Sequence, residues 1–473
     1  MKVLLVNPPV PKRTILNVLP PIGLGYLSTA LKKNGIVVNI LDCIKKKLAF
    51  SDFVEEVKKS QPEVIGIQVF SHAFEMVKKG LTLIRKAKDD VVIVVGGPHP
   101  SGLPEETLYS MKEADFGFRG EAEIGLPMLI KQIINFKNPI DIPPNVLEEV
   151  PGLIWRRNSR VICNSPVFVE NLDELGCPDW ELINPREYPQ APQGVVFKNW
   201  PAAPIVATRG CPFNCTFCAG STISGRKTRF RSIKNIIEEI KFLSSRFGVK
   251  EIHILDDNFM LKRQYVRNFC RALIDDKIEI SWCCPNGVRL DNLDEETLLL
   301  MKKSGCYYIS VGIESGSSRI LAHMKKGFTT VQVGEKVSLA RKAGLAVNGF
   351  FILGYPEEKR QDILQTIRFA QELRLTRAAF FNFLPLPGTE IYTELKQKGK
   401  IQKLQLNKLY EAYVPYAPEG ISKKELKNLQ RRAYLKFYLR PKTLVALLKE
   451  IKTLNQLKFI VRRFFTYLWC KGY

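Results

Sequence analysis

Short apolar runs alternate with amphipathic stretches along roughly the first 135 residues of the chain. Apolar runs bounded by turn residues predict strands, and apolar positions spaced three and four apart predict helices. The alternation therefore predicts five β-α repeats, which is typical of a doubly wound parallel sheet. The expected strands are 3–6, 37–41, 64–69, 91–95 and 116–118, and the helices between them include 23–33, 53–59 and 73–87.

A second series of repeats begins at residue 205. Six strands with this spacing predict a partial (β/α)6 barrel of the TIM type, in which the chemistry lies at the carboxyl ends of the strands. The expected strands are 205–208, 251–255, 278–285, 307–313, 346–353 and 378–383, and the helices include 233–247, 264–275, 295–304 and 329–343. The fold class is thus α/β, with a doubly wound domain at 1–137, a linker with a β-hairpin at 138–203, the barrel at 204–395 and a basic helical region at 396–473.

Composition narrows the class of protein. The chain has 473 residues, of which 45% are hydrophobic and 25% charged, so we expect two or three globular domains rather than disorder. No uncharged apolar run reaches the roughly 18 residues that span a membrane, and the first residues predict a strand rather than a signal peptide. Eleven cysteines in such a chain favour metal ligands and buried apolar positions over disulfides. We therefore expect a cytoplasmic protein.

The net charge of +24 is concentrated near the C-terminus, where residues 421–473 hold 14 Lys or Arg against 2 Asp or Glu. Basic and aromatic residues alternate at helical spacing in 434–441 and 457–473, which include Trp469. This pattern favours a helical cap on the barrel, with peripheral membrane contact as the alternative. The motif-bearing loops carry ordinary charge, so we expect no nucleic-acid partner.

Three cysteines follow a predicted strand in the segment TRGCPFNCTFC (208–218). Their spacing, C-x3-C-x2-C, brings three thiolates together from one short loop. A structural zinc site needs four ligands, whereas a [4Fe–4S] cluster held by three cysteines keeps one iron open for another ligand. We therefore expect Cys211, Cys215 and Cys218 to hold a [4Fe–4S] cluster, and a zinc ion completed by a distant residue is the alternative.

This loop resembles the cluster-binding loop of the radical S-adenosylmethionine superfamily. The resemblance covers roughly residues 205–392 and includes the segments GIESG (312–316), GFFILGYPEE (349–358) and PLPGT (385–389). It implies that the open iron chelates the amino and carboxylate groups of S-adenosylmethionine. One electron from the oxygen-sensitive cluster then breaks a C–S bond and gives a 5′-deoxyadenosyl radical. The residues that the resemblance assigns to S-adenosylmethionine are Phe217, Asp257, Asn286, Arg289, Glu314, Ser315, Phe351 and Gly354.

One segment departs from the superfamily pattern. The usual Gly-Gly-Glu after the second strand is replaced by LDDNF (255–259). A carboxylate near the methionine amino group is all that this position requires, so Asp257 is either that partner or a helix cap.

The N-terminal domain resembles the cobalamin-binding domains of one large branch of the same superfamily, over about residues 1–134. The matching segments are NPP (7–9), PPIGLGYL (20–27), GGPH (96–99) and RGEAE (119–123). The resemblance assigns cobalamin to Asn7, Pro8, Gly23, Ser71, Gly96, Gly97, Gly120 and Glu121. The chain lacks the Asp-x-His-x-x-Gly motif of many cobalamin domains, as members of this branch commonly do, and a degenerate domain without a ligand is the alternative.

A related branch, the methylthiotransferases acting on transfer RNA, is excluded by ligand count. Their α/β domain supplies three cysteines for a second cluster, and the corresponding domain of this chain contains Cys43 alone.

Together the resemblances imply a cobalamin-dependent methyltransferase that acts on an unactivated carbon of a small-molecule or lipid substrate, with an electron donor such as flavodoxin or ferredoxin. The alternative is a radical cyclase, a ring-contracting enzyme or an oxidative enzyme acting on a lipid, isoprenoid, tetrapyrrole or other natural product. A third interpretation, a non-enzymatic protein with a structural zinc, requires four protein ligands at the metal.

Overall fold

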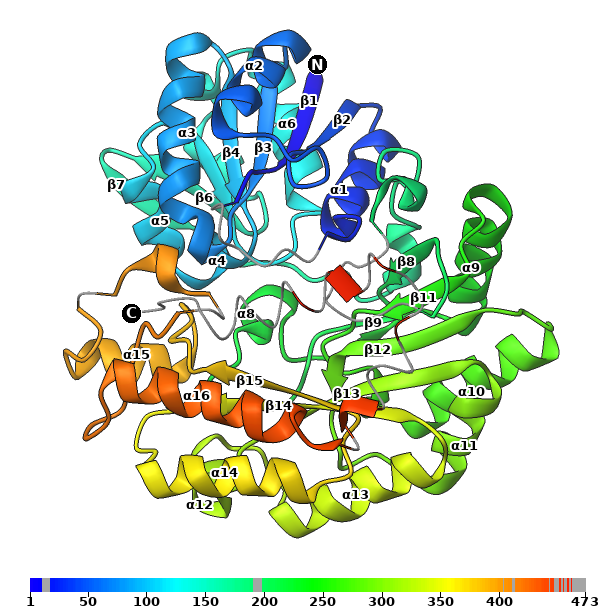
Figure 1. Ribbon diagram of the computed structural model, residues 1–473. Helices are drawn as coiled ribbons and strands as arrows, with labels where there is room; N and C mark the ends of the chain where they lie inside the picture. Colours follow the sequence, from blue (N-terminus) through cyan, green and yellow to red (C-terminus); the bar gives the residue numbers. More distant parts are fainter. Residues whose placement is uncertain are drawn as a thin grey trace.

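The protein, seen here as a computed structural model, consists of two α/β units, drawn one above the other in Figure 1. The upper unit (blue to cyan) comes from the N-terminal part of the chain and the lower unit (green to orange) from the C-terminal part. The structure describes residues 1–10, 18–189, 198–402, 404–410, 413–441 and 443–445, and single residues 451, 454, 457, 458 and 461. The segment 462–473, with Trp469, lies outside the described residues, as does most of 446–461.

The N-terminal unit is built on a sheet with the strand order β2-β1-β3-β4-β5-β6-β7. Strands β1 to β5 are parallel, and the hairpin β6–β7 extends the sheet in antiparallel fashion. The strands are β1 (Lys2–Asn7), β2 (Val37–Asp42), β3 (Val64–Gln68), β4 (Val92–Gly96), β5 (Phe116–Phe118), β6 (Leu153–Arg157) and β7 (Arg160–Cys163).

Helices cover both faces of this sheet. Helices α1 (Ile22–Lys33) and α6 (Gly125–Phe136) pack on one face, and α2 (Phe50–Ser60), α3 (Phe74–Ala87) and α5 (Pro104–Ser110) pack on the other. Each face has its own apolar core. The predicted doubly wound fold is therefore confirmed.

The second unit is a parallel sheet with the order β15-β14-β13-β12-β11-β8. In the described part of the chain the outer strands β8 and β15 do not pair with each other, so the barrel is open, as predicted. The strands are β8 (Ala202–Ile205), β11 (Glu251–Ile254), β12 (Ser281–Val288), β13 (Cys306–Glu314), β14 (Ala346–Leu353) and β15 (Arg377–Asn382).

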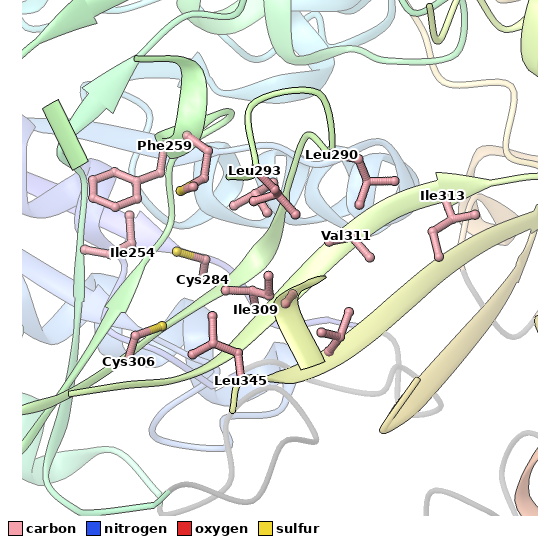
Figure 2. Packing of buried hydrophobic residues seen from close by; sticks show 14 of the residues in the cluster. Ile254, Phe259, Cys284, Leu290, Leu293, Cys306, Ile309, Val311, Ile313 and Leu345 are labelled. Atoms are coloured by element: carbon pink, nitrogen blue, oxygen red, sulfur yellow. The ribbon is translucent and has the colours of Figure 1, made fainter. Parts of the chain in front are cut away.

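The helices of this unit pack against one face of the curved sheet. They are α9 (Ile233–Phe247), α10 (Arg263–Asp275), α11 (Glu295–Lys303), α13 (Thr330–Lys342) and α14 (Arg360–Glu372). Alternate strand residues such as Ile309, Val311 and Ile313 enter the core beneath these helices (Figure 2). The intervening residues face the barrel interior, as the period of two in a strand requires.

The structure divides the first predicted barrel strand, 205–208. Strand β8 ends at Ile205, and the chain continues into β9 (Thr208–Arg209), which pairs with β10 (Arg229–Phe230) in a separate two-stranded ribbon. The carboxylate of Asp256 accepts hydrogen bonds from the Ala207 amide at 2.7 Å and from the Thr208 hydroxyl at 2.7 Å. These bonds satisfy groups that would otherwise need a sheet partner, so the chain can leave the sheet here.

The open edge of the barrel is covered by α16 (Lys423–Tyr438). Gln430 donates to the Phe380 carbonyl at 2.7 Å, and the hydroxyls of Tyr434 and Tyr438 accept from β15 amides at 3.2 Å each. An uncovered edge strand would expose these backbone groups. The helix therefore caps the barrel over 423–438, and no helix among the described residues is long and apolar enough to cross a membrane.

Candidate functional site

The cysteine loop lies between β9 and β10, so a two-stranded ribbon closes its base. Gly210 opens it with φ +88°, and a Cβ there would collide with the Lys227 carbonyl. Cys211 and Cys215 are partly buried, whereas Cys218 is exposed. Desolvation by the surrounding protein raises the pKa of the Cys211 thiol, and that of Cys218 to about 11. Thiolates at this loop therefore need a metal to stabilise them.

The spacing of the sulfur atoms argues against zinc. Among the described residues, the set of three metal-ligand atoms within 4.8 Å of one another is Glu251, His253 and Cys283, and it does not include the loop cysteines. Thiolates on one zinc ion lie about 2.3 Å from the metal and hence closer together than this. Three more widely spaced cysteines from one loop are the donor set of a [4Fe–4S] cluster with one open iron.

Two predicted residues lie beside the cysteines. A Cβ on Gly220 would lie 3.4 Å from Asp257 Oδ1 and 3.5 Å from Cys218 Sγ, which places the Asp257 carboxyl next to that thiol. Arg289 Nη1 lies 3.9 Å from Cys215 Sγ, and its guanidinium lies 3.5 Å from the centre of the Phe213 ring. Burial raises the pKa of Asp257. The loop is thus flanked by a carboxyl group on one side and by a guanidinium on the other.

The carboxyl end of β13 adds a second charged pair. Glu314, with φ +66°, lies 3.2 Å from Lys326 Nζ, and both side chains are buried. Lys326 also faces the ring of Phe217, 5.8 Å from its centre, and its carbonyl accepts from Arg289 at 2.6 Å. The sequence analysis did not single out Lys326. Its Lys-Lys-Gly-Phe setting (325–328) carries no signal until the fold places it beside Glu314.

Four predicted residues have other surroundings. Asn286 donates to the Leu255 carbonyl at 2.8 Å, which ties the end of β12 to that of β11. Ser315 is buried and bonds Thr366 at 3.2 Å. Phe351 is fully buried and stacks on Phe380, and Gly354 lies against Leu426 of α16. The structure does not bring Ser315, Phe351 or Gly354 to the cysteine loop.

A cavity of about 340 Å³ separates the two units. The carboxyl ends of β3, β4 and β5 border it on one side, and the ends of β8 and β11 border it on the other. Of the residues assigned to cobalamin, Gly23, Gly96, Gly97, Gly120 and Glu121 line it.

The glycines leave backbone exposed to this space. A Cβ on Gly23 would meet nothing within 4 Å, and one on Gly96 would first meet Phe118 at 3.9 Å. Gly97 has φ +102°, which other residues rarely adopt. A glycine cradle at the carboxyl edge of a doubly wound sheet fits cobalamin, as ligands of such sheets bind there.

Asn7, Pro8 and Ser71 do not line the cavity. Asn7 donates to Asp42 at 3.0 Å, and Ser71 lies 2.9 Å from the buried His99 ring. They shape the loops after β1 and β3 instead.

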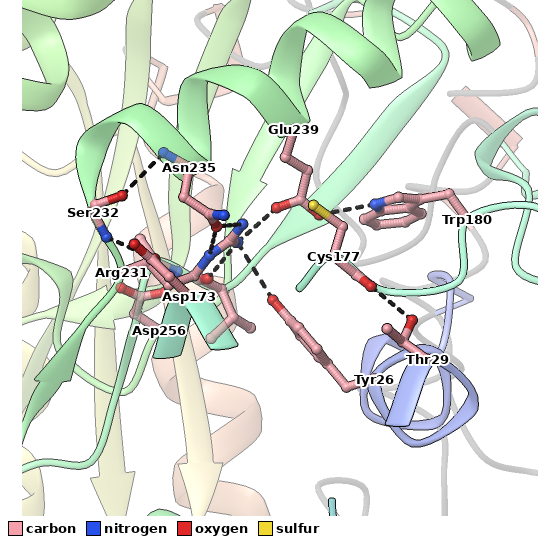
Figure 3. Close-up of polar contacts among 12 residues, drawn as sticks. Tyr26, Thr29, Asp173, Cys177, Trp180, Arg231, Ser232, Asn235, Glu239 and Asp256 are labelled. Atoms are coloured by element: carbon pink, nitrogen blue, oxygen red, sulfur yellow. Dashed lines mark hydrogen bonds and ion pairs between the residues drawn. The ribbon is translucent and has the colours of Figure 1, made fainter. Parts of the chain in front are cut away.

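The two units are joined next to the cavity by a network of buried side chains (Figure 3). Arg231 pairs with Glu239 of α9 at 2.6 Å and reaches the Tyr26 hydroxyl of α1 at 3.4 Å. Trp180 donates to Glu239 at 2.8 Å, and Thr29 donates to the Cys177 carbonyl at 2.7 Å. Helix α1 of the N-terminal unit is thereby fixed against the barrel.

Comparison with known proteins gives matches to both units. The sequence profile of the radical SAM superfamily matches residues 205–370, and that of the B12 binding domain matches residues 10–130. The chain is 32% identical over 453 residues to the uncharacterized methyltransferase PH0819 of Pyrococcus horikoshii, a match that covers 94% of each protein. It is 28% identical over 452 residues to the cytidylyl-2-hydroxyethylphosphonate methyltransferase of Streptomyces wedmorensis, which covers 84% of this chain and 82% of the relative.

The fold is shared with a solved structure, that of the cobalamin-dependent S-adenosylmethionine radical enzyme OxsB with aqua-cobalamin and S-adenosylmethionine bound. The TM-score is 0.75 at 18% identity, and the match covers 98% of this chain and 71% of OxsB. The chain therefore belongs to the radical SAM superfamily, and it is an enzyme with a B12 binding domain whose cofactors are a [4Fe–4S] cluster, S-adenosylmethionine and cobalamin.

Proposed function

We propose that the protein is a cobalamin-dependent methyltransferase that adds a methyl group to an unactivated carbon of a small molecule. The observation that carries the proposal is the cavity shared by the two units. Its glycine edge and its cysteine-bearing edge face the same space, so both cofactors can reach one substrate. Relatives named as methyltransferases support the same reaction class.

We assign the cluster to Cys211, Cys215 and Cys218, and cobalamin to the glycines that line the cavity. Asp257, Arg289 and the pair Glu314–Lys326 offer both charge signs near the cysteines, which suits the amino and carboxylate groups of S-adenosylmethionine. When bound, these cofactors supply a 5′-deoxyadenosyl radical and a transferable methyl group.

The chain itself excludes water from the reaction. Gly102 of α4 (Pro98–Gly102) packs directly on the loop after β15, where a Cβ would lie 2.6 Å from the Pro387 carbonyl. This contact closes the barrel mouth against the N-terminal unit. Reactive radicals survive only where solvent and side reactions are kept out.

Two partners complete the proposal. An electron donor such as flavodoxin or ferredoxin reduces the cluster in the cytoplasm. The basic residues after α16, together with the exposed Leu439, Leu444 and Val445, make peripheral contact with anionic membranes, and in that case the substrate is a lipid. Sedimentation with anionic vesicles, compared between the full chain and a chain ending at residue 441, tests this contact.

The test of the reaction is product analysis under anaerobic conditions. The protein is reconstituted with iron, sulfide and hydroxocobalamin, and then given reductant, S-adenosylmethionine and candidate substrates. About four irons and one cobalt per chain are expected. S-adenosylhomocysteine together with 5′-deoxyadenosine and a methylated product supports the methyltransferase. 5′-Deoxyadenosine alone favours radical cyclisation or oxidation, and iron without cobalt contradicts the proposal.

A further inference from the structure

The cysteine loop has one arginine at each end. Arg209 is the last residue of β9 before the loop, and Arg229 is the first residue of β10 after it. The two are paired in register across the ribbon. Any force on these arginines therefore acts on the base of the loop that carries Cys211, Cys215 and Cys218.

Both arginines are held by acids from the other unit. Glu121 accepts from Arg229 Nη1 at 2.8 Å and from Arg229 Nη2 at 2.6 Å, and it lies 3.4 Å from Arg209 Nη1. Glu123 pairs with Arg209 Nη1 at 2.8 Å. These four residues form an interdomain ion-pair network that links RGEAE (119–123) to the base of the loop.

The network is nearly inaccessible to water. Its side chains are between 2% and 12% exposed. Burial alone would lower the pKa of Arg209, but Glu123 and Glu121 raise it above its ordinary value. Tyr26 of α1 adds a ring 4.7 Å from the Arg209 guanidinium. A two-pronged guanidinium–carboxylate contact in a dry setting fixes both distance and orientation.

The network also borders the cavity. Glu121, Glu123 and Arg209 all line it, as do Gly96, Gly97 and Gly120 on the same edge. It therefore lies between the cradle assigned to cobalamin and the loop assigned to the cluster. Removing one carboxylate would leave a buried arginine unpaired, and the loop would have to move to solvate it.

We propose that Glu121 and Glu123 are positioning residues that act through Arg209 and Arg229 to set the distance between the iron–sulfur cluster and the cobalt. The inference rests on the two-cofactor assignment of the proposed function, but it requires neither a substrate nor methyl transfer. It also gives Glu121 a role different from direct contact with cobalamin.

The experiment measures that distance in the protein loaded with both cofactors. Reduction to the paramagnetic cluster and to Co(II) allows pulsed EPR to report their dipolar interaction. Wild type should give one narrow distance distribution. We expect Glu121→Gln and Glu123→Gln to shift the mean by about 1 Å or to broaden the distribution about twofold, a displacement large enough to impair catalysis.

Glu239→Gln is the matched control. It removes an equally buried carboxylate from Arg231, but Glu239 belongs to α9 and does not join the loop to the N-terminal unit. We expect it to lower thermal stability and to leave the distance unchanged. An unchanged distribution in Glu121→Gln and Glu123→Gln at full iron and cobalt content would overturn the proposal. So would weakened cobalamin binding with no change at the cluster, because it would make Glu121 a direct cobalamin contact.

A second measurement covers variants that retain too little cobalamin. Hydrogen exchange of peptides from 205–230 is followed in the cluster-loaded protein without cobalamin. At least about tenfold faster exchange in Glu123→Gln than in Glu239→Gln supports the network, since local opening controls such exchange. Equal exchange in the two variants refutes it. This result is independent of the reaction that the enzyme catalyses.

Discussion

The two sides of the cavity hold their cofactors by opposite means. The N-terminal side removes side chains, so that Gly23, Gly96 and Gly97 leave backbone open to a large ligand. The barrel side adds thiols and charges, with the cysteines flanked by Asp257 and Arg289. The difference teaches that a residue on the first side matters for the space it leaves and a residue on the second side for the bonds it makes.

The largest effect is expected from removing a bond on the barrel side. Cys215→Ala leaves two thiolates for the cluster, and we expect iron to fall from about four atoms per chain to less than about one. 5′-Deoxyadenosine formation should disappear with it. Iron analysis and the EPR spectrum of the reduced protein measure the loss. Cys163→Ala, at the far edge of the N-terminal sheet in β7, should keep full iron, and equal loss in both variants would contradict the assignment.

The next largest effect is expected from filling space on the N-terminal side. Gly23→Leu places a side chain in the cavity, and we expect cobalamin affinity to fall at least about 100-fold, or roughly 2.7 kcal/mol. Equilibrium dialysis of the cluster-loaded protein measures the change. Gly334→Leu is the control, because Gly334 is also a helical glycine whose Cβ would meet nothing within 4 Å, but it lies in α13. Both variants should fold, since glycine is a poor helix former.

The fold and the cluster ligands were predictable for a common reason. Strand and helix periods are local, and Cys211, Cys215 and Cys218 lie within one loop, so the sequence order already implies their proximity. The partial barrel and the doubly wound sheet follow from patterns of the same kind.

The residues that the sequence did not identify depend on contacts between distant segments. Lys326 gains its position only when the fold places it beside Glu314. Phe351 and its neighbour Phe350 look alike in sequence, and only the pairing register decides which of them enters the core. Glu121 is 88 and 108 positions from its arginine partners, and no local pattern predicts such a contact.

The third effect concerns pH on the barrel side, where Asp256 supports the start of the cysteine loop. Burial raises the pKa of Asp256 to about 7 from its ordinary value of 3.8. Because the folded-state pKa is raised, stability is highest at low pH and is lost as the pH rises toward 7. This group alone should cost about 2 kcal/mol between about pH 5 and pH 7.

Asp256→Asn tests this assignment. The amide oxygen can still accept from Ala207, and the Thr208 hydroxyl can rotate to accept from the amide nitrogen. Urea unfolding at several pH values should show a shallower pH dependence in the variant than in wild type. Parallel curves would mean that Asp256 does not titrate in this range.

The smallest effect separates the two faces of β14. Phe351 is fully buried against Phe380, so Phe351→Leu should lower the free energy of unfolding by about 1 kcal/mol and leave S-adenosylmethionine affinity within about twofold. Phe350 points to the opposite face, where a Cβ on Gly287 would lie 3.6 Å from its ring. Phe350→Leu should instead weaken S-adenosylmethionine binding about threefold, with little change in stability. Urea unfolding and equilibrium dialysis of the cluster-loaded protein measure the two quantities. The reverse pattern would place the cofactor against Phe351 and would require a barrel register one residue away from the one described here, because neighbouring residues of a strand cannot face the same side.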